Sequence, residues 1–211
     1  MRLCDSRVLT SLITLTVCAF AISHGSTILR FARVRAAVLS HDRPVETLRP
    51  WMTVTGVAGD ALAVPLTEPV QPDDREVARR RADALSAIIA VQPLSAMNWL
   101  SLASMRLVTA EPLDNVAAAL SMSALTGPNE AFVMSRRGIF GLLQWDVLPA
   151  DQRRRAVADF AAAIPALPNA DHAMNAAKAI LSAKTDDVRE EVAVSLRAQG
   201  LSPSDLARVG L

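Results

Sequence analysis

Four polar residues in the middle of the chain have types that could recognise an anionic partner. They fall on the first helix of two successive helical patterns, and they are Asn98, Arg106, Arg136 and Arg137. A guanidinium group presents a fork of donors that matches a carboxylate, so we expect these residues to line a groove that receives a carboxylate or an extended peptide. The alternative is that the arginines keep the surface soluble or pair with carboxylates of the same chain, namely Glu111, Asp146 or Asp159.

No other residues form a pattern that carries out chemistry. The histidines are scattered and form no H-E-x-x-H motif: His24, His41 and His172. The sequence also lacks the G-x-S-x-G elbow and the dinucleotide-binding fingerprint. Asp146, Asp151 and Asp159 could act as paired carboxylates, but Asp151 has the position of a helix N-cap and the other two have the positions of solvated faces. We therefore predict no enzymatic activity, no cofactor and no metal ion.

The composition is typical of closely packed helices. Hydrophobic residues make up 51% of the 211 positions, yet aromatic residues make up only 4% and tyrosine is absent. Strands favour aromatic and β-branched residues, so we expect an all-α protein. Basic and acidic residues are nearly balanced, 22 against 21, and the basic excess is confined to residues 1–50. A body without excess positive charge argues against a nucleic-acid partner.

Residues 1–35 are expected to form a membrane anchor with a basic flank. Residues 8–29 contain no Asp, Glu, Lys or Arg, and three arginines follow between positions 30 and 35. About 20 such residues span a bilayer as a helix. A cleaved signal peptide is the competing interpretation, because Ala-Phe-Ala at 19–21 resembles a cleavage site. A buried core helix is the third interpretation.

Residues 36–74 are predicted to be a connecting segment rich in proline and glycine. Prolines at 44, 50, 65, 69 and 72 and glycines at 56 and 59 prevent a long helix. Hydrophobic residues such as Trp51 and Val54 make the segment too apolar for a free linker. We expect it to lie against the helical body.

The remainder, 75–211, follows helical spacing to its end. Asp73 or Asp74 supplies an N-cap, Pro93 stops the first helix, and Gly200 has the position of a C-terminal cap. The predicted helices are approximately 75–91, 95–109, 113–125, 129–144, 150–164, 170–183, 186–199 and a short helix after 203. The fourth of these carries its apolar residues at Phe132, Ile139, Phe140 and Leu143.

The prolines that end helices recur at a nearly constant interval. Pro93, Pro128 and Pro165 are 35 and 37 residues apart, and each interval holds two helices. An interval of this size is typical of a helical solenoid. Trp99-x-x-Leu102-Ala103, with Ala118-x-x-x-Met122 before Pro128, resembles the tetratricopeptide repeat, whose period is about 34 residues.

The next interval resembles the same repeat. Met134 takes the tryptophan position, Gly138 takes the small position, and Ala156-x-x-x-Phe160 precedes Pro165. The resemblance covers 73–168 and implies antiparallel helical hairpins stacked into a solenoid, with the first helix of each hairpin on the concave face. An irregular helical bundle is the alternative, because Arg106 stands where the repeat has an aromatic residue.

The stretch LTGPNEAF, residues 125–132, is predicted to join two repeats. Gly127 ends one helix, Pro128 prevents its continuation, and Asn129 caps the next helix. A phosphate-binding loop is the functional alternative. It is disfavoured because Glu130 would repel the anion and no Lys-Ser/Thr pair follows.

The strings LTGPNE and SRRGIFGLLQW also resemble small helical-repeat proteins associated with surface-polysaccharide genes in alphaproteobacteria. This resemblance implies an accessory role in polysaccharide assembly or export, without chemistry of its own. We therefore expect a non-enzymatic scaffold of the bacterial cell envelope, anchored in the cell membrane with its helical domain in the periplasm, that binds other envelope proteins or peptides. The alternative is a soluble protein, secreted to the periplasm after signal cleavage, that binds a peptide or glycan.

Overall fold

The computed structural model describes residues 14–23, 25, 26, 29, 32 and 74–211. The chain divides into two compact units, Met1–Pro65 and Leu66–Leu211. In the first unit, residues 14–23 are helical and their side chains are exposed. No helix among the described residues combines the length and the apolar character that crossing a bilayer requires. Much of the predicted anchor, and all of the predicted connecting segment except Asp74, lie outside the described residues.

Every regular element described in the second unit is a helix, which confirms the prediction of an all-α protein. Along the chain these elements are α4 (Arg75–Val91), α5 (Ala96–Val108), α6 (Leu113–Thr126), α7 (Ala131–Leu143), α8 (Ala150–Ala163), the 3₁₀ turn η3 (Ile164–Ala166), α9 (Asp171–Ser182), α10 (Asp186–Ala198) and α11 (Pro203–Arg208). Their bounds agree with the predicted helices to within two residues at each end, because capping and helix-breaking residues mark most of the ends.

Two helix starts show how the sequence sets these bounds. The Asp74 carboxylate accepts a hydrogen bond from the backbone N–H of Val77 at 3.2 Å, and α4 begins at the next residue, Arg75. The Ser202 hydroxyl accepts a hydrogen bond from the backbone N–H of Asp205 at 3.1 Å, with Pro203 as the first helical residue of α11. Each side chain satisfies a backbone donor that the first helical turn leaves without a partner.

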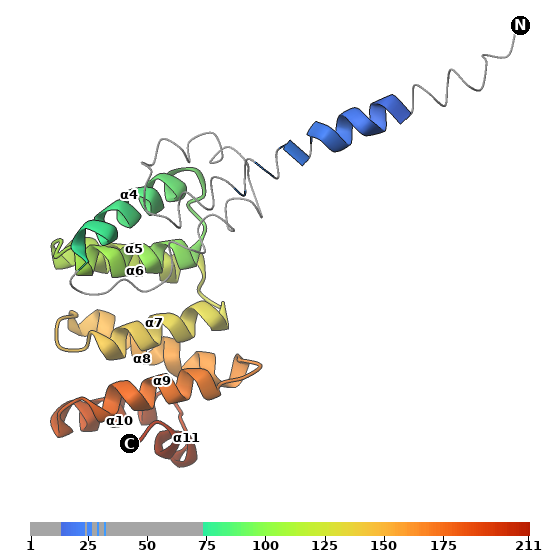
Figure 1. Ribbon diagram of the computed structural model, residues 1–211. Helices are drawn as coiled ribbons and strands as arrows, with labels where there is room; N and C mark the ends of the chain where they lie inside the picture. The colour runs from blue at the N-terminus through green and yellow to red at the C-terminus, as the bar shows by residue number, and fades with distance from the viewer. Residues whose placement is uncertain (1–13, 24, 27–28, 30–31, 33–73) are drawn as a thin grey trace, which may run out of the picture. The chain divides into compact units, whose positions relative to one another are not determined.

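Helices α5 to α8 form two packed pairs, and the pairs are stacked. Helix α5 packs against α6, α7 packs against α8, and α4 packs against α5. Helix α7 also contacts α5 and α9, and α8 contacts α10, so the first helices of successive pairs are neighbours. Figure 1 shows the pairs α5/α6 and α7/α8 as successive layers, followed by α9, which contacts α7, and α10, which contacts α8, with α11 at the C-terminal end.

Two glycines bring α7 and α8 into close contact. A Cβ atom built on Gly138 would lie 2.5 Å from the Phe160 Cβ atom, and one built on Gly141 would overlap the Ala156 Cβ atom. Both glycines are buried, so a larger residue at either position would force the two helices apart. The two helices can therefore pack this closely only because hydrogen atoms stand where other residues have side chains.

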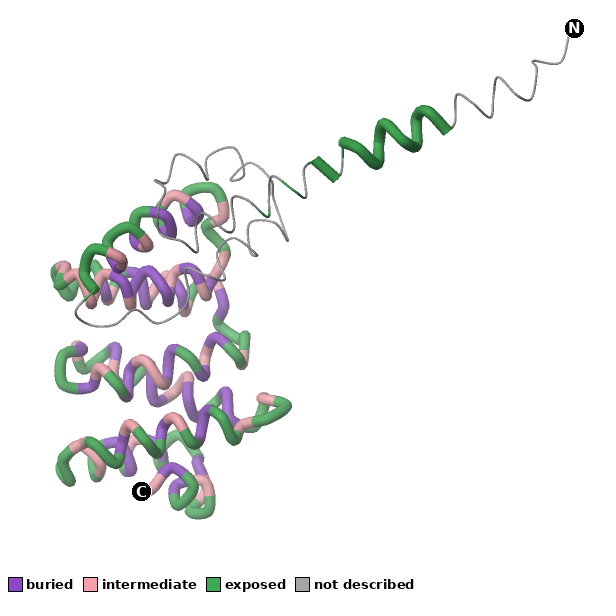
Figure 2. Tube along the Cα trace, viewed as in Figure 1, coloured by how far each residue is buried: buried purple, intermediate pink, exposed green. Residues whose placement is uncertain are grey.

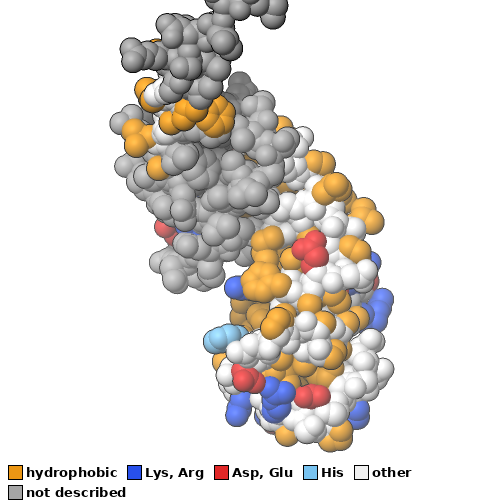
Figure 3. Space-filling view, turned by 90° about the vertical axis from the view of Figure 1, so that its right-hand side faces the viewer, with side chains coloured by type: hydrophobic (Ala, Val, Ile, Leu, Met, Phe, Trp, Pro, Cys, Tyr) orange, Lys and Arg blue, Asp and Glu red, His pale blue; other side chains and the backbone are white. Residues whose placement is uncertain are grey.

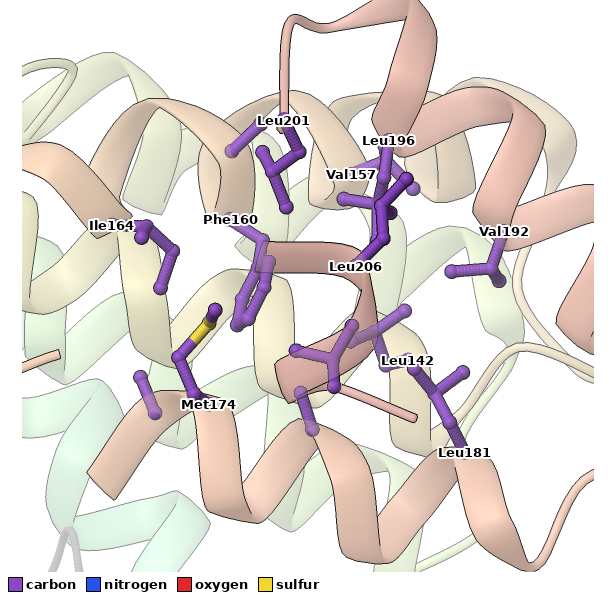
Figure 4. Close-up of a cluster of buried hydrophobic side chains, with 14 of the residues drawn as sticks. Leu142, Val157, Phe160, Ile164, Met174, Leu181, Val192, Leu196, Leu201 and Leu206 are labelled. Carbon is purple, nitrogen blue, oxygen red and sulfur yellow. The ribbon is translucent and has the colours of Figure 1, made fainter. Parts of the chain in front are cut away.

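A large apolar cluster joins the last two helix pairs. It contains Phe160, Met174 and Leu181, which are at most 1% exposed, together with Leu206 of α11 (Figure 4). Val209, the residue after α11, also belongs to the cluster. A second cluster joins α5, α6 and α7 and includes Leu100, Val116 and Val133. Figure 2 shows that the buried positions lie where the helices face one another. Burial of this kind supplies the main favourable contribution to folding.

Three local predictions were wrong. Phe132 and Leu143 were assigned to the apolar face of the fourth helix, but they are 57% and 50% exposed. The face of α7 that is actually buried consists largely of glycine and polar residues, which hydrophobic periodicity does not register. Asn129 does not cap α7, since the N-cap position falls at Glu130 and no side chain caps it. Asp151 lies in the first turn of α8, whose N-cap is Pro149.

Gly127 ends α6 for a different reason than the one predicted. Its φ of −138° lies outside the left-handed region in which a C-terminal glycine usually stands. A Cβ atom at this position would lie 2.5 Å from the Cβ atom of Ala96 at the start of α5. The glycine is required by the close approach of the α6–α7 junction to α5.

Candidate partner-binding surface

The four residues predicted to line a groove do not form one in the structure. Asn98 and Arg137 are buried, with 1% and 3% exposure, whereas Arg106 is half-buried and Arg136 is exposed. The arrangement therefore places the exposed guanidinium of Arg136 on the surface and the guanidinium of its neighbour Arg137 in the interior. The two are adjacent in sequence, and successive helical residues point about 100° apart.

Arg137 forms an ion pair that joins α7 to α8. Its Nε lies 2.7 Å from Asp159 Oδ2 and its Nη2 lies 3.2 Å from Asp159 Oδ1, which is a bidentate geometry. Its side chain is 3% exposed and that of Asp159 is 13% exposed. Charge-assisted pairs of this geometry are stronger than neutral hydrogen bonds. The alternative drawn from the sequence, in which one of the arginines pairs with Asp159, therefore holds for Arg137.

The same guanidinium also joins α7 to the end of α6. It donates to the backbone carbonyl of Ser123 at 3.0 Å and to that of Gly127 at 3.2 Å. The hydroxyl of Ser123 in turn donates to the carbonyl of Ala96 at 2.8 Å, in the first turn of α5. A continuous polar network therefore runs through α5, α6, α7 and α8, and it includes the junction LTGPNEAF.

Asn98 is buried in the helical unit, and Arg106 binds groups of the same chain. The Asn98 Nδ2 atom is buried and has no hydrogen-bond partner among the described residues. The Arg106 guanidinium donates to the backbone carbonyl of Asn115 at 3.1 Å and lies 3.5 Å from the Glu111 carboxylate. It fastens α5 to the start of α6, so a partner would have to displace these contacts to use it.

Arg136 differs from the other three residues because its charge faces solvent. Its guanidinium lies 5.3 Å from the centroid of the Phe132 ring, in cation–π contact. Within residues 74–211, no carboxylate lies at ion-pair distance from it. A cation–π contact leaves the hydrogen-bond donors at the edge of the guanidinium available. The Arg136 guanidinium can therefore still donate two parallel hydrogen bonds to a carboxylate.

An exposed, mostly apolar stripe surrounds Arg136 on α7. We call Phe132, Arg136 and Leu143 the α7 stripe; at 100° per residue they lie within about 40° of one another around the helix. Leu125, near the end of α6, is a further exposed hydrophobic residue, at 71%. Figure 3 views the end of the unit where α7 and α9 begin, and it shows hydrophobic side chains exposed among charged ones. Clusters of exposed large hydrophobic residues mark interaction surfaces.

A hollow adjoins the other end of the α7 stripe. It is an open depression of about 480 Å³, lined mainly by Leu143, by Ala179, Ile180 and Ala183 near the end of α9, and by the ion pair between Lys184 and Asp146. The Lys184 ammonium lies 2.6 Å from the Asp146 carboxylate and also donates to the backbone carbonyl of Leu143 at 3.2 Å. Leu143 belongs to both the stripe and the hollow.

The carboxylates considered as an acid–base pair are held by separate partners. Asp159 binds Arg137, Asp146 binds Lys184, and Asp151 accepts a hydrogen bond from the Gln152 amide at 3.1 Å. Over the described part of the chain, no three His, Cys, Asp or Glu side chains converge as metal ligands would. The prediction that the chain is not an enzyme stays a prediction.

The exposure of Phe132 and Leu143 was not predicted from the sequence. Both were read as core residues because they are large and apolar and share one helical face. The signal that could have corrected this is the glycine pair Gly138 and Gly141, which lies on another face of the same helix. Glycine at helical spacing marks close backbone approach, so the face that bears it is the buried one.

Comparison of the chain with protein-family models, with curated proteins and with solved structures gives no match.

Proposed function

We propose that this chain is a non-enzymatic scaffold of the bacterial cell envelope whose helical-repeat domain binds other envelope proteins. The domain would correspond to a tetratricopeptide-like solenoid, and the N-terminal residues would anchor it in the cell membrane. The observation that carries the proposal is the α7 stripe, an exposed cation flanked by exposed hydrophobic residues. Aromatic residues and arginine are the types most enriched where proteins bind one another.

The stacked helix pairs support the repeat assignment. In tetratricopeptide repeats, small residues let the two helices of a hairpin approach closely, and Gly138 against Phe160 has this relationship here. The first helices α5, α7 and α9 are neighbours, as the first helices of stacked hairpins would be. A stack of this kind offers a continuous surface along its first helices, which suits an extended partner.

The anchor in the proposal depends on the sequence alone. Residues 8–29 are free of charged side chains and long enough to span a bilayer. The second candidate is a secreted periplasmic protein with the same helical domain that binds a peptide or a glycan, and it is favoured by the Ala-Phe-Ala cleavage-like site at 19–21. Sequencing the N-terminus of the mature protein separates the two: an intact start agrees with the anchor, and a start at Ile22 agrees with secretion.

The class of partner is inferred from the resemblance to proteins associated with surface-polysaccharide genes. On this basis we propose that the bound envelope proteins belong to the machinery that assembles or exports a surface polysaccharide. The chain would hold such proteins together without performing a reaction of its own.

Photo-crosslinking in living cells tests the binding surface directly. A photoreactive phenylalanine analogue placed at position 132 would lie at the stripe, and the same analogue at Val194, which is 51% exposed on α10, provides a matched control. We expect position 132 to give a defined set of crosslinked envelope proteins that position 194 does not give. Absence of adducts, or identical adducts from both positions, would contradict the proposal.

A further inference from the structure

Helices α9 and α10 follow one another along the chain, but among the described residues they make very little direct contact with each other. The helices of the preceding pairs, α5 with α6 and α7 with α8, pack closely. Helix α11 instead contacts both α9 and α10. We propose that residues 201–211, which we call the α11 strap, are a conformational device that holds α9 and α10 apart, and that release of the strap lets the two helices close into a packed pair. This inference does not depend on the proposed function.

The apolar residues of the α11 strap are buried in the interior of the last layer. Leu201, Leu206 and Val209 are at most 8% exposed and belong to the same buried cluster as Met174 of α9 and Leu196 of α10. Figure 4 shows Leu201 and Leu206 in one cluster with residues of α8, α9 and α10. In a closely packed hairpin the apolar faces of the two helices contact one another directly. Here the strap takes the place of part of that interface.

Two polar contacts fasten the α11 strap, one to each helix. Arg208 Nη2 lies 2.6 Å from Oδ1 of Asp171, the first residue of α9. Arg189 of α10 donates from Nη2 to the backbone carbonyl of Gly210 at 2.8 Å. The ion pair is exposed, with 45% and 72% of the two side chains accessible, so it contributes little to stability. The strap is therefore held mainly by its buried apolar residues, and a substitution among these would release it.

Helices α9 and α10 carry residues that suit direct packing once the strap is released. Ala173 and Ala177 on α9 and Ala193 on α10 are buried, and small residues let helix backbones approach closely. Release of the strap would leave the apolar cluster facing water, and closure of α9 on α10 would remove that surface from water again. The layer therefore has two packed arrangements, one with the strap seated and one without it, as a conformational switch requires.

Spin-label distances measured by pulsed electron paramagnetic resonance on the full-length protein in mild detergent test this inference. His172→Cys in the first turn of α9 and Arg197→Cys in the last turn of α10 place labels at exposed positions, at the helix ends remote from the turn that joins the two helices. The native thiols are removed by Cys4→Ser and Cys18→Ser.

The strap is released by Leu206→Asp, because an unpaired carboxylate is too costly to bury in the apolar cluster. We expect the distance between the two labels to shorten by several ångströms in this variant. Leu206→Met keeps an apolar side chain of similar volume, so it should keep the wild-type distance. A second label pair, at the exposed positions Asn129 and Ala162 next to the start of α7 and the end of α8, should be unchanged in both variants.

An unchanged or longer distance between the labels on α9 and α10 in Leu206→Asp would overturn the inference, because the strap would then not be what keeps the helices apart. Circular dichroism checks that the variant keeps its helices. If Leu206→Asp loses them, the same distances are measured in Leu206→Ala/Val209→Ala, which shortens the apolar side chains of the strap without adding a charge. In that variant a smaller shortening between α9 and α10 is expected, and its absence overturns the inference in the same way.

Discussion

Arg136 and Arg137 are adjacent in the sequence, yet Arg136 is exposed and Arg137 is buried. The sequence places Arg136 and Arg137 side by side, and both were predicted to line a groove. In the structure Arg137 is 3% exposed and is bound by Asp159 and by the carbonyls of Ser123 and Gly127. A buried guanidinium is tolerated only when most of its donors are satisfied, and here they bind groups of α8 and of the C-terminal end of α6.

Removing this guanidinium should destabilise the helical domain strongly. Arg137→Ala leaves the Asp159 carboxylate, whose side chain is only 13% exposed, without its partner and two backbone carbonyls without their donor. We expect the free energy of unfolding to fall by about 3 kcal/mol, as measured by urea denaturation followed by circular dichroism.

The matched control for this prediction is Arg136→Ala, one residue earlier. It removes an exposed guanidinium and one cation–π contact, so the loss should stay below about 1 kcal/mol. Equal stability of the two variants would show that the Arg137 network does not hold the helices together.

At this scale the sequence predicts which residues are chemically able to bind but not which way they point. The side chains of Arg136 and Arg137 point about 100° apart, so one can be buried while the other is exposed. Which of the two is buried can be predicted only when the buried face of α7 is known. That face is defined by Gly138 and Gly141, which hydrophobic periodicity ignores. The alternative pairing of an arginine with Asp159 was open from the sequence, because opposite charges 22 residues apart can meet across a hairpin.

At the scale of elements, the α7–α8 pair depends on a seam of small residues. Gly138 faces Phe160 and Gly141 faces Ala156, with no room for an added methyl group at either glycine. Glycine lowers the intrinsic stability of a helix, so its presence at two positions of α7 is offset by closer packing against α8.

Gly141→Ala should therefore destabilise the protein although alanine is the better helix former. The overlap of the new methyl group with the Ala156 Cβ atom is expected to cost about 1–3 kcal/mol, against a gain of about 1 kcal/mol in helix propensity. Thermal and urea unfolding of the purified protein provide the measurement.

A double variant shows whether the seam is the cause. In Gly141→Ala/Ala156→Gly the methyl group is moved from α8 to α7, so the overlap disappears and the double variant should be more stable than Gly141→Ala alone. If the two substitutions destabilise additively, the close contact between these residues does not limit the packing of the helices.

Helix existence and bounds were predictable to within two residues, since prolines and capping residues are local signals. Asp74 before α4 and Ser202 before α11 act as the capping rules predict. Asn129 does not cap α7, and Gly127 is required by contact with Ala96, a residue in the preceding helix pair. That contact is tertiary, so the local sequence around the junction could not predict it.

At the scale of the whole molecule, the polar network and the glycine seam have complementary roles. The seam joins the two helices of one pair, while the network of Ala96, Ser123, Arg137 and Asp159 joins that pair to the one before it. Both lie on the inner sides of the helices, which leaves Phe132, Arg136 and Leu143 on the outside. The fold thus leaves the α7 stripe exposed on packed helices.

The proposed scaffold role is tested most directly by quantitative co-purification of envelope proteins with three versions of the full-length protein in mild detergent. The versions are the wild type, the stripe variant Phe132→Ala/Arg136→Glu, and a control, Arg154→Glu, which reverses an exposed charge on α8. We expect a defined set of envelope proteins that the wild type and the control retain and the stripe variant loses, with all three equally helical by circular dichroism. Retention of the same set by the stripe variant, or no specific set with the wild type, would contradict the claim that this chain is a scaffold acting through α7.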